Sequence, residues 1–133
     1  SLMFAPAVAK PAEIFRGTRA LLVPSVWDEP FGRVAAEALL NGVPPLVSDR
    51  GGLAEAANGG GFVLPLPASL TMETRTPVAA ADVEPWLATI IRLTDDQDFY
   101  AAASARARAA ANAYQPEILG RRYVDYFTGI LPA

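Results

Sequence analysis

Two glutamates eight residues apart are the side chains best suited to chemistry in this sequence. Glu29 ends an acidic loop, and Glu37 lies in the apolar helical pattern that follows it. Eight residues span about two turns of an α-helix, so both carboxylates can face the same side. A carboxylate accepts two hydrogen bonds well from vicinal hydroxyl groups. The pair therefore suits a sugar and a ribose flanking a diphosphate, and it predicts a nucleotide-sugar or polyol ligand.

Two predicted helix starts could hold the anionic part of such a ligand. One lies at 31–34, and the other at 51–53, where Gly51 and Gly52 would let a ligand approach the backbone closely. Helix N-termini present unpaired N–H groups and a partial positive charge, and in open α/β sheets they gather beyond the carboxyl ends of the strands. A phosphate fits either start, although the glycine pair could equally make only a turn.

The elements that must position these groups alternate between strand and helix. Apolar runs predict short strands at 20–24, 43–48 and 62–66, and the first has the continuous apolar character of a strand covered on both faces. Residues 67–81 have no periodicity and are predicted to form a loop. The alternation predicts an α/β fold, with a Rossmann-like parallel sheet of about three strands flanked by helices. Helices are expected at 12–16, from 30 or 31 to 40 or 41, and at 53–57, 83–93, 96–114 and 116–129.

The composition excludes several kinds of site. The chain has 133 residues, 52% of them hydrophobic and 19% charged, which suits one globular domain. A formal net charge of -3 and the lack of a basic run argue against a nucleic-acid partner. The sequence contains no cysteine and no histidine, so disulfides, thiolate metal sites and the usual neutral-pH base are excluded. No clustered acidic triad suggests a Mg²⁺ site, and we expect neither a metal nor a cofactor.

The sequence also indicates where the protein resides. The N-terminus lacks the charged and apolar regions of a signal peptide. No apolar run approaches the roughly 20 residues that a membrane-spanning helix needs. We therefore expect a soluble, cytoplasmic protein without a transmembrane segment.

The residues around the two glutamates resemble a known family. The combined motifs are similar to those of the C-terminal, donor-binding domain of retaining glycosyltransferases of family 4, the glycosyl transferases group 1, which have the GT-B fold. The resemblance extends from about residue 11 to the end of the chain. Its motifs are Pro24-Ser25-x-Trp27-x-Glu29-Pro30-Phe31-Gly32, Glu37, Gly42-Val43-Pro44 and Ser48-Asp49-x-Gly51-Gly52-x-x-Glu55.

The resemblance implies a reaction and roles for both carboxylates. The full-length enzyme would transfer a hexosyl group from a nucleotide diphosphate sugar to an alcohol acceptor, with retention of configuration. Glu29 would contact hydroxyl groups of the donor sugar and act as the catalytic carboxylate. Glu37 would contact the ribose of the nucleotide.

The resemblance also implies roles for backbone groups near the carboxylates. The N–H groups of Phe31, Gly32 and Arg33 would lie near the donor sugar and its diphosphate. Gly51 and Gly52 would complete the donor-binding set.

Members of the family contain more chain than is present here. They have an N-terminal Rossmann-like domain that contributes acceptor-binding groups, and a basic Arg and Lys pair that neutralises the diphosphate. We therefore expect 1–133 to be a single truncated domain that lacks its N-terminal partner domain. Within it, 11–66 would carry the motif, 67–81 would be a loop and 82–129 the C-terminal helices. The nearby cations that could replace the basic pair are Arg16, Arg19, Arg33 and Arg50.

Other functions and partners stay open. A glycosidase also uses paired carboxylates, but about 5 to 9.5 Å apart across a scissile bond, which a pair on one helix suits less well. The chain could also be a catalytically inert folded fragment or a protein-interaction domain. Three strands with an open edge would invite pairing with a second copy, so we expect a homodimer or a domain-swapped form. Aromatic residues expected in the core or at the seam to the missing domain are Trp86, Tyr123, Tyr126 and Phe127.

Overall fold

A parallel three-stranded sheet forms the centre of the computed structural model, which describes residues 11–130. Leu22 of the first strand lies beside Leu46 of the second, and Val47 of the second lies beside Val63 of the third. This arrangement confirms the predicted α/β, Rossmann-like sheet. The strands, in the spatial order β1-β2-β3, are β1 (Leu21–Val23), β2 (Pro45–Ser48) and β3 (Phe62–Leu64).

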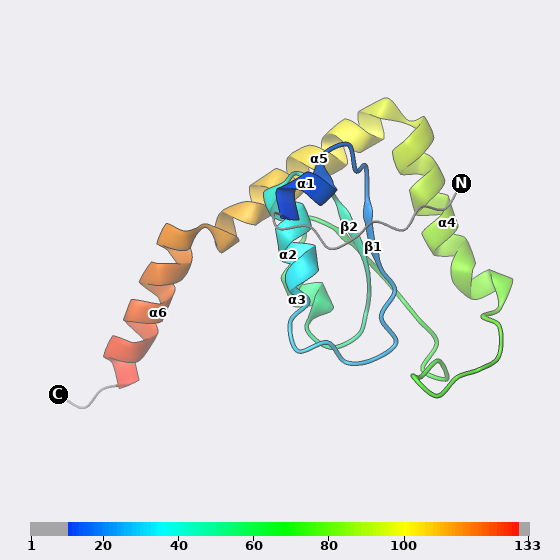
Figure 1. The fold of residues 1–133 in the computed structure, drawn as a ribbon, viewed down its shortest axis with the longest axis horizontal. Helices are drawn as coiled ribbons and strands as arrows, with labels where there is room; N and C mark the ends of the chain where they lie inside the picture. Colours follow the sequence, from blue (N-terminus) through cyan, green and yellow to red (C-terminus); the bar gives the residue numbers. More distant parts are fainter. Residues whose placement is uncertain (1–10, 131–133) are drawn as a thin grey trace.

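Helices cover both faces of the sheet. Figure 1 shows α2 and α3 on one side, α4 on the other, and α5 running across from α4 towards α6. The carboxyl ends of the strands are therefore bordered by loops rather than by α5. The helices are α1 (Pro11–Phe15), α2 (Arg33–Leu40), α3 (Leu53–Ala57), α4 (Ala80–Asp95), α5 (Gln97–Ala111), the 3-10 helix η1 (Asn112–Tyr114) and α6 (Pro116–Ile130).

The central strand β2 joins the two halves of the core. Its residues alternate between faces, as in any strand. Leu46 packs in a cluster with Trp86 and Leu93 from α4, whereas Val47 packs in a cluster with Leu53 of α3. Leu46, Val47 and Leu53 are fully buried, and each such side chain stabilises the fold by roughly 1.5 to 3 kcal/mol.

The helix α2 begins later than the sequence predicted. We expected its start at Pro30 or Phe31, but the first helical residue is Arg33. Gly32 precedes it in the left-handed conformation, with φ of 88°, which ends the loop and turns the chain into the helix. At the other end Gly42 has φ of 70°, a left-handed conformation that ends the helix.

The other predicted boundaries hold to within a few residues. The loop that begins at 67 ends before Ala80, because α4 starts three residues earlier than predicted. Asp96 caps α5, since its carboxylate accepts the Phe99 N–H at 2.9 Å. The last turn before Tyr114 tightens into η1. Residues 1–10 and 131–133 of the predicted domain lie outside the described residues.

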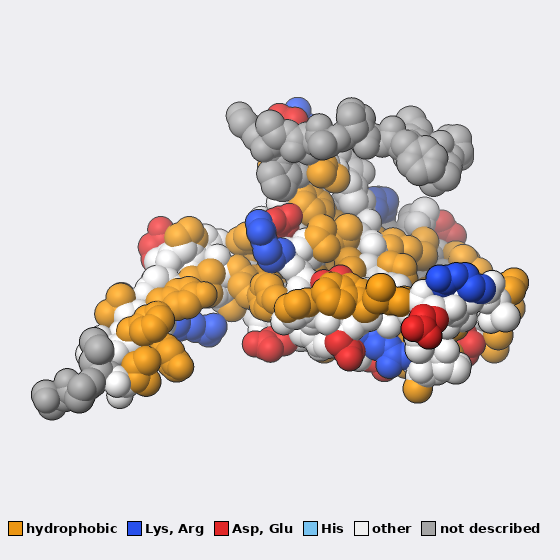
Figure 2. Space-filling view, turned by 60° about the horizontal axis from the view of Figure 1, so that its bottom comes forward, with side chains coloured by type: hydrophobic (Ala, Val, Ile, Leu, Met, Phe, Trp, Pro, Cys, Tyr) orange, Lys and Arg blue, Asp and Glu red, His pale blue; other side chains and the backbone are white. Residues whose placement is uncertain are grey.

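The first strand and the last helix are less covered than predicted. Leu22 of β1 is 45% exposed and lines an apolar cavity of about 410 Å³, so cover on both faces holds for β2 but not for β1. Trp86 is buried as predicted, but Tyr123, Tyr126 and Phe127 of α6 are exposed and are not part of this core. Figure 2 shows the hydrophobic side chains gathered on this projecting helix. The predicted homodimer through the sheet edge stays a prediction.

No helix within residues 11–130 combines the length and the apolar character needed to cross a membrane.

Candidate functional site

Two loops lie side by side at the carboxyl edge of the sheet. Residues 24–32 connect β1 to α2, and residues 49–52 connect β2 to α3. Ser48, the last residue of β2, donates its hydroxyl hydrogen to the Ser25 carbonyl at 2.6 Å. Because β1 and β2 are parallel neighbours, both loops leave the sheet at the same edge. Most of the predicted site residues therefore gather around two connected loops, whereas Glu37 lies further along, in α2.

The glycine pair packs against the backbone of the first loop. The Gly52 N–H donates to the Glu29 carbonyl at 2.7 Å. A Cβ atom at Gly51 would lie 2.5 Å from the Glu29 backbone nitrogen, and one at Gly52 would lie 2.7 Å from the Pro30 carbonyl oxygen. The space that these glycines leave is thus filled by protein backbone, which explains why glycine is needed there. Their contact with a donor stays a prediction.

The Glu29 carboxylate is held by its own loop. Trp27 donates its indole Nε1–H to Glu29 Oε1 at 3.0 Å, and the Ser25 hydroxyl lies 3.4 Å from the same oxygen. Neither side chain was predicted to hold this carboxylate. The signal that could have revealed these contacts was the presence of two side-chain donors within four residues of a carboxylate.

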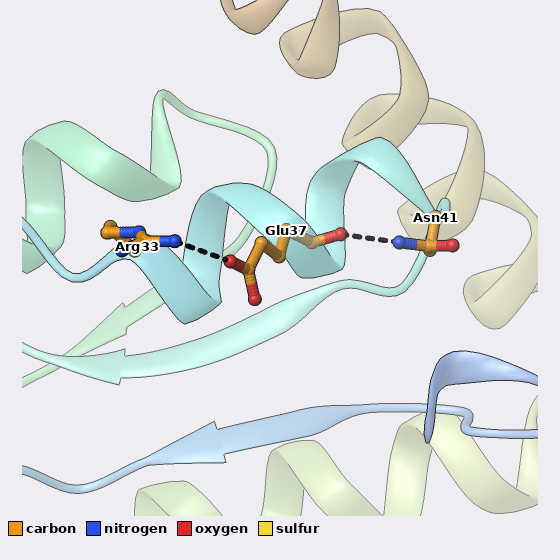
Figure 3. Close-up of polar contacts among 3 residues, drawn as sticks. All are labelled: Arg33, Glu37 and Asn41. Atoms are coloured by element: carbon orange, nitrogen blue, oxygen red, sulfur yellow. Dashed lines mark hydrogen bonds and ion pairs between the residues drawn. The ribbon is translucent and has the colours of Figure 1, made fainter. Parts of the chain in front are cut away.

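Glu37 lies in the middle of α2, one turn after Arg33, whereas Glu29 lies in the loop before the helix, so the two carboxylates are not related by two turns of one helix. Glu37 Oε1 is 3.7 Å from Arg33 Nη2, and the Glu37 carbonyl accepts the Asn41 Nδ2–H at 2.8 Å (Figure 3). The Arg33 side chain is 87% exposed, so this ion pair contributes little stability. Glu37 and Glu29 share no hydrogen-bond or ion-pair partner within the described range. Each carboxylate therefore has its own partners, those of Glu29 in the loop before α2 and those of Glu37 along α2.

Two of the nearby arginines have structural partners. Arg19 donates to the Leu93 carbonyl at 2.9 and 3.1 Å. Arg50 Nη2 donates to the Pro67 carbonyl at 2.7 Å and to the Leu66 carbonyl at 3.2 Å. These contacts fix the end of α4 and the loop after β3. Neither arginine could bind a diphosphate at full strength without giving up such bonds.

The Phe31 ring makes an aromatic contact that links the loop before α2 to η1. Its ring meets the Tyr114 ring edge-on, with centroids 6.0 Å apart. The Tyr114 hydroxyl lies 2.9 Å from the Ala56 carbonyl and 3.1 Å from the Glu55 carbonyl, to which it donates its hydrogen. Burial, and to a lesser degree the Glu55 charge, raise the pKa of Tyr114 above its usual value. Tyr114 therefore satisfies the last carbonyls of α3 while neutral.

Replacing Tyr114 by Phe is expected to lower the free energy of unfolding by about 1 kcal/mol, because the part-buried Ala56 carbonyl of α3 loses its donor. The raised pKa favours the neutral phenol in the folded state. This stabilisation is present below pH of about 10 and is lost as the pH rises through the raised pKa. Urea unfolding at pH 7 and at increasing alkaline pH measures both effects. Tyr123→Phe, at an exposed position, is the control and should change little; equal losses in the two variants would contradict the contact.

Comparison with known proteins identifies the family. The profile of the glycosyl transferases group 1 matches residues 2–115, a stretch that contains the sheet, both glutamates and Tyr114 and ends just before α6. No curated protein and no solved structure matches the chain. Since the family match covers most of the 133 residues, this chain belongs to the glycosyl transferases group 1.

Proposed function

We propose that this chain is the donor-binding domain of a retaining glycosyltransferase, which transfers a hexosyl group from a nucleotide diphosphate sugar to an alcohol acceptor. The observation that carries the proposal is the Glu29 carboxylate, fixed by Trp27 beside the carboxyl edge of a parallel sheet. Membership of the glycosyl transferases group 1 supports the same conclusion. Ligands of open α/β sheets bind at this edge.

Each carboxylate has a separate task in the proposed site. Glu29 accepts hydrogen bonds from the donor sugar, and Glu37 accepts them from the ribose. The N–H groups of Phe31, Gly32 and Arg33 lie at the entrance to α2, where the helix dipole favours negative charge. They stabilise the leaving diphosphate as its charge develops.

A second Rossmann-like domain completes the proposed enzyme. It supplies the acceptor-binding groups, and a basic pair adds to the neutralisation of the diphosphate. The exposed apolar residues of α6 support such a partner, because a helix with no buried residue gains stability by packing. The side chains that would pack against that domain include Tyr123, Tyr126 and Phe127.

A titration with nucleotide sugars tests the donor site. UDP-glucose, GDP-mannose and ADP-glucose are each titrated into the chain by calorimetry, and binding of at least one is expected. Glu37→Ala should weaken that binding about tenfold, the effect of losing one hydrogen bond to a charged group. Glu84→Ala, an exposed carboxylate on α4, is the matched control and should leave the affinity unchanged.

Two results would contradict the proposal. If none of the three nucleotide sugars binds, the chain is better described as a folded fragment without a donor site. Hydrolysis of an aryl glycoside without any nucleotide would favour a glycosidase instead, because that reaction needs only the two carboxylates and water.

A further inference from the structure

The two oxygens of the Glu29 carboxylate have different surroundings. The Trp27 indole N–H at 3.0 Å and the Ser25 hydroxyl at 3.4 Å both point to Oε1. Within residues 11–130 the structure gives Oε2 no protein donor. The Ser25 hydroxyl also lies 3.4 Å from the Trp27 carbonyl, and its single hydrogen can serve only one of these acceptors. The indole N–H is therefore the main bond on this carboxylate.

The backbone of Glu29 is fixed independently of its side chain. The Gly52 N–H bonds the Glu29 carbonyl at 2.7 Å, and the left-handed turn at Gly51 packs against the Glu29 backbone. What remains free is rotation of the side chain about its own bonds, which is costly to restrict when a ligand binds. A bond from Trp27 removes that freedom before the ligand arrives.

We infer that Trp27 is a positioning residue for donor binding: its indole N–H holds Glu29 Oε1 and so presents Oε2 to a hydroxyl group of the donor sugar. This inference rests on the proposed function of Glu29. The exposure of Trp27 supports it, because 46% of the residue remains accessible and the ring is not needed to fill the core. Trp86 provides the contrast, since it is buried and its indole nitrogen has no partner among residues 11–130.

Two substitutions at position 27 separate the hydrogen bond from the ring. Trp27→Phe keeps an aromatic ring but removes the N–H. Trp27→His removes the larger apolar ring but keeps an N–H, because Nε2 of imidazole occupies the same ring position as Nε1 of indole. If Trp27 acts through its N–H, the affinity for the nucleotide sugar that binds the wild-type chain should fall about fivefold in Trp27→Phe and be largely restored in Trp27→His. If Trp27 acts only by packing, Trp27→Phe should keep more of the nucleotide-sugar affinity than Trp27→His.

A second measurement detects the bond without any donor. The chain has two tryptophans, so a ¹⁵N-labelled sample gives two indole N–H resonances. Glu29→Gln should move the Trp27 resonance, because its acceptor loses a full charge, and should leave the Trp86 resonance in place. Thermal unfolding of all variants checks that each is folded.

The outcomes distinguish this inference from the proposed function. Binding to wild type that is unchanged in Trp27→Phe, or a Trp27 resonance that does not move in Glu29→Gln, would overturn the positioning role and leave the donor site intact. Failure of wild type to bind UDP-glucose, GDP-mannose or ADP-glucose would overturn both. Both the positioning role and the proposed function are supported if affinity decreases in the order wild type, Trp27→His, Trp27→Phe and the Trp27 resonance moves in Glu29→Gln.

Discussion

Gly51→Ala is expected to lower the free energy of unfolding by about 2 to 4 kcal/mol. Gly51 has φ of 53°, a conformation that costs a residue with a Cβ atom about 1 kcal/mol or more. The new Cβ would also lie 2.5 Å from the Glu29 backbone nitrogen, so the two loops must separate. Separation weakens the bond from Gly52 to the Glu29 carbonyl, which contributes about another 1 kcal/mol. Urea unfolding measures the total loss of unfolding free energy in Gly51→Ala.

Gly59→Ala is the matched control for this prediction. Gly59 also has a positive φ, 71°, but a Cβ atom there would meet nothing within 4 Å. Only the conformational cost of about 1 kcal/mol is expected in Gly59→Ala. The difference between the two variants therefore measures the packing of the glycine turn against the Glu29 loop. Equal losses would show that this packing is absent.

Gly51→Ala should also impair donor binding if Glu29 serves the proposed function. Glu29 depends on the turn for the position of its backbone, whereas Gly59 lies beyond α3, away from the loop that carries Glu29. Gly51→Ala should therefore weaken nucleotide-sugar binding at temperatures where the variant is still folded, and Gly59→Ala should not. A purely structural glycine turn would leave the affinity of both folded variants unchanged.

The order of strands and helices could be predicted from the sequence because the apolar runs are short and separated by turn residues. The second of those runs became β2, buried on both faces, and the third became β3. The start of α2 was misplaced because proline is favoured in the first turn of a helix, whereas Gly32 in the left-handed conformation moves the start to Arg33. Local preferences could not predict that Gly32 must also make room for the Leu53 side chain.

The two candidate carboxylates could be chosen from the sequence, but the side chains that hold them could not. Glu37 lies in α2 as predicted, whereas Glu29 lies in the loop before it, so helix geometry does not relate the directions of the two side chains. The bond from Trp27 to Glu29 forms within an irregular loop, where no period relates sequence to direction. For α6 the pattern predicted an apolar face but could not predict what covers it. In the described residues that face is exposed.

Leu46→Ala is expected to cost about 2 to 5 kcal/mol of unfolding free energy, the usual range for deleting a fully buried leucine side chain. Leu46 is fully buried on the central strand and packs in a cluster with Trp86, Leu93 and Ala103 on the face that α4 and α5 cover. The cavity left behind cannot collapse easily, because β2 is held on both sides by β1 and β3. Urea unfolding followed by circular dichroism measures the loss.

Leu22→Ala provides the matched control, because Leu22 is the direct neighbour of Leu46 in the sheet and the chemical change is identical. Leu22 is 45% exposed beside the apolar cavity next to β1, so its truncation removes less buried surface and leaves no closed void. About 1 kcal/mol or less is expected for the isolated chain. If another strand or a second copy covers the β1 edge in solution, Leu22 is buried there and its cost rises towards that of Leu46. The ratio of the unfolding free energies lost in Leu22→Ala and Leu46→Ala therefore reports whether the β1 edge is open. A large loss in both variants would contradict the exposed edge of β1.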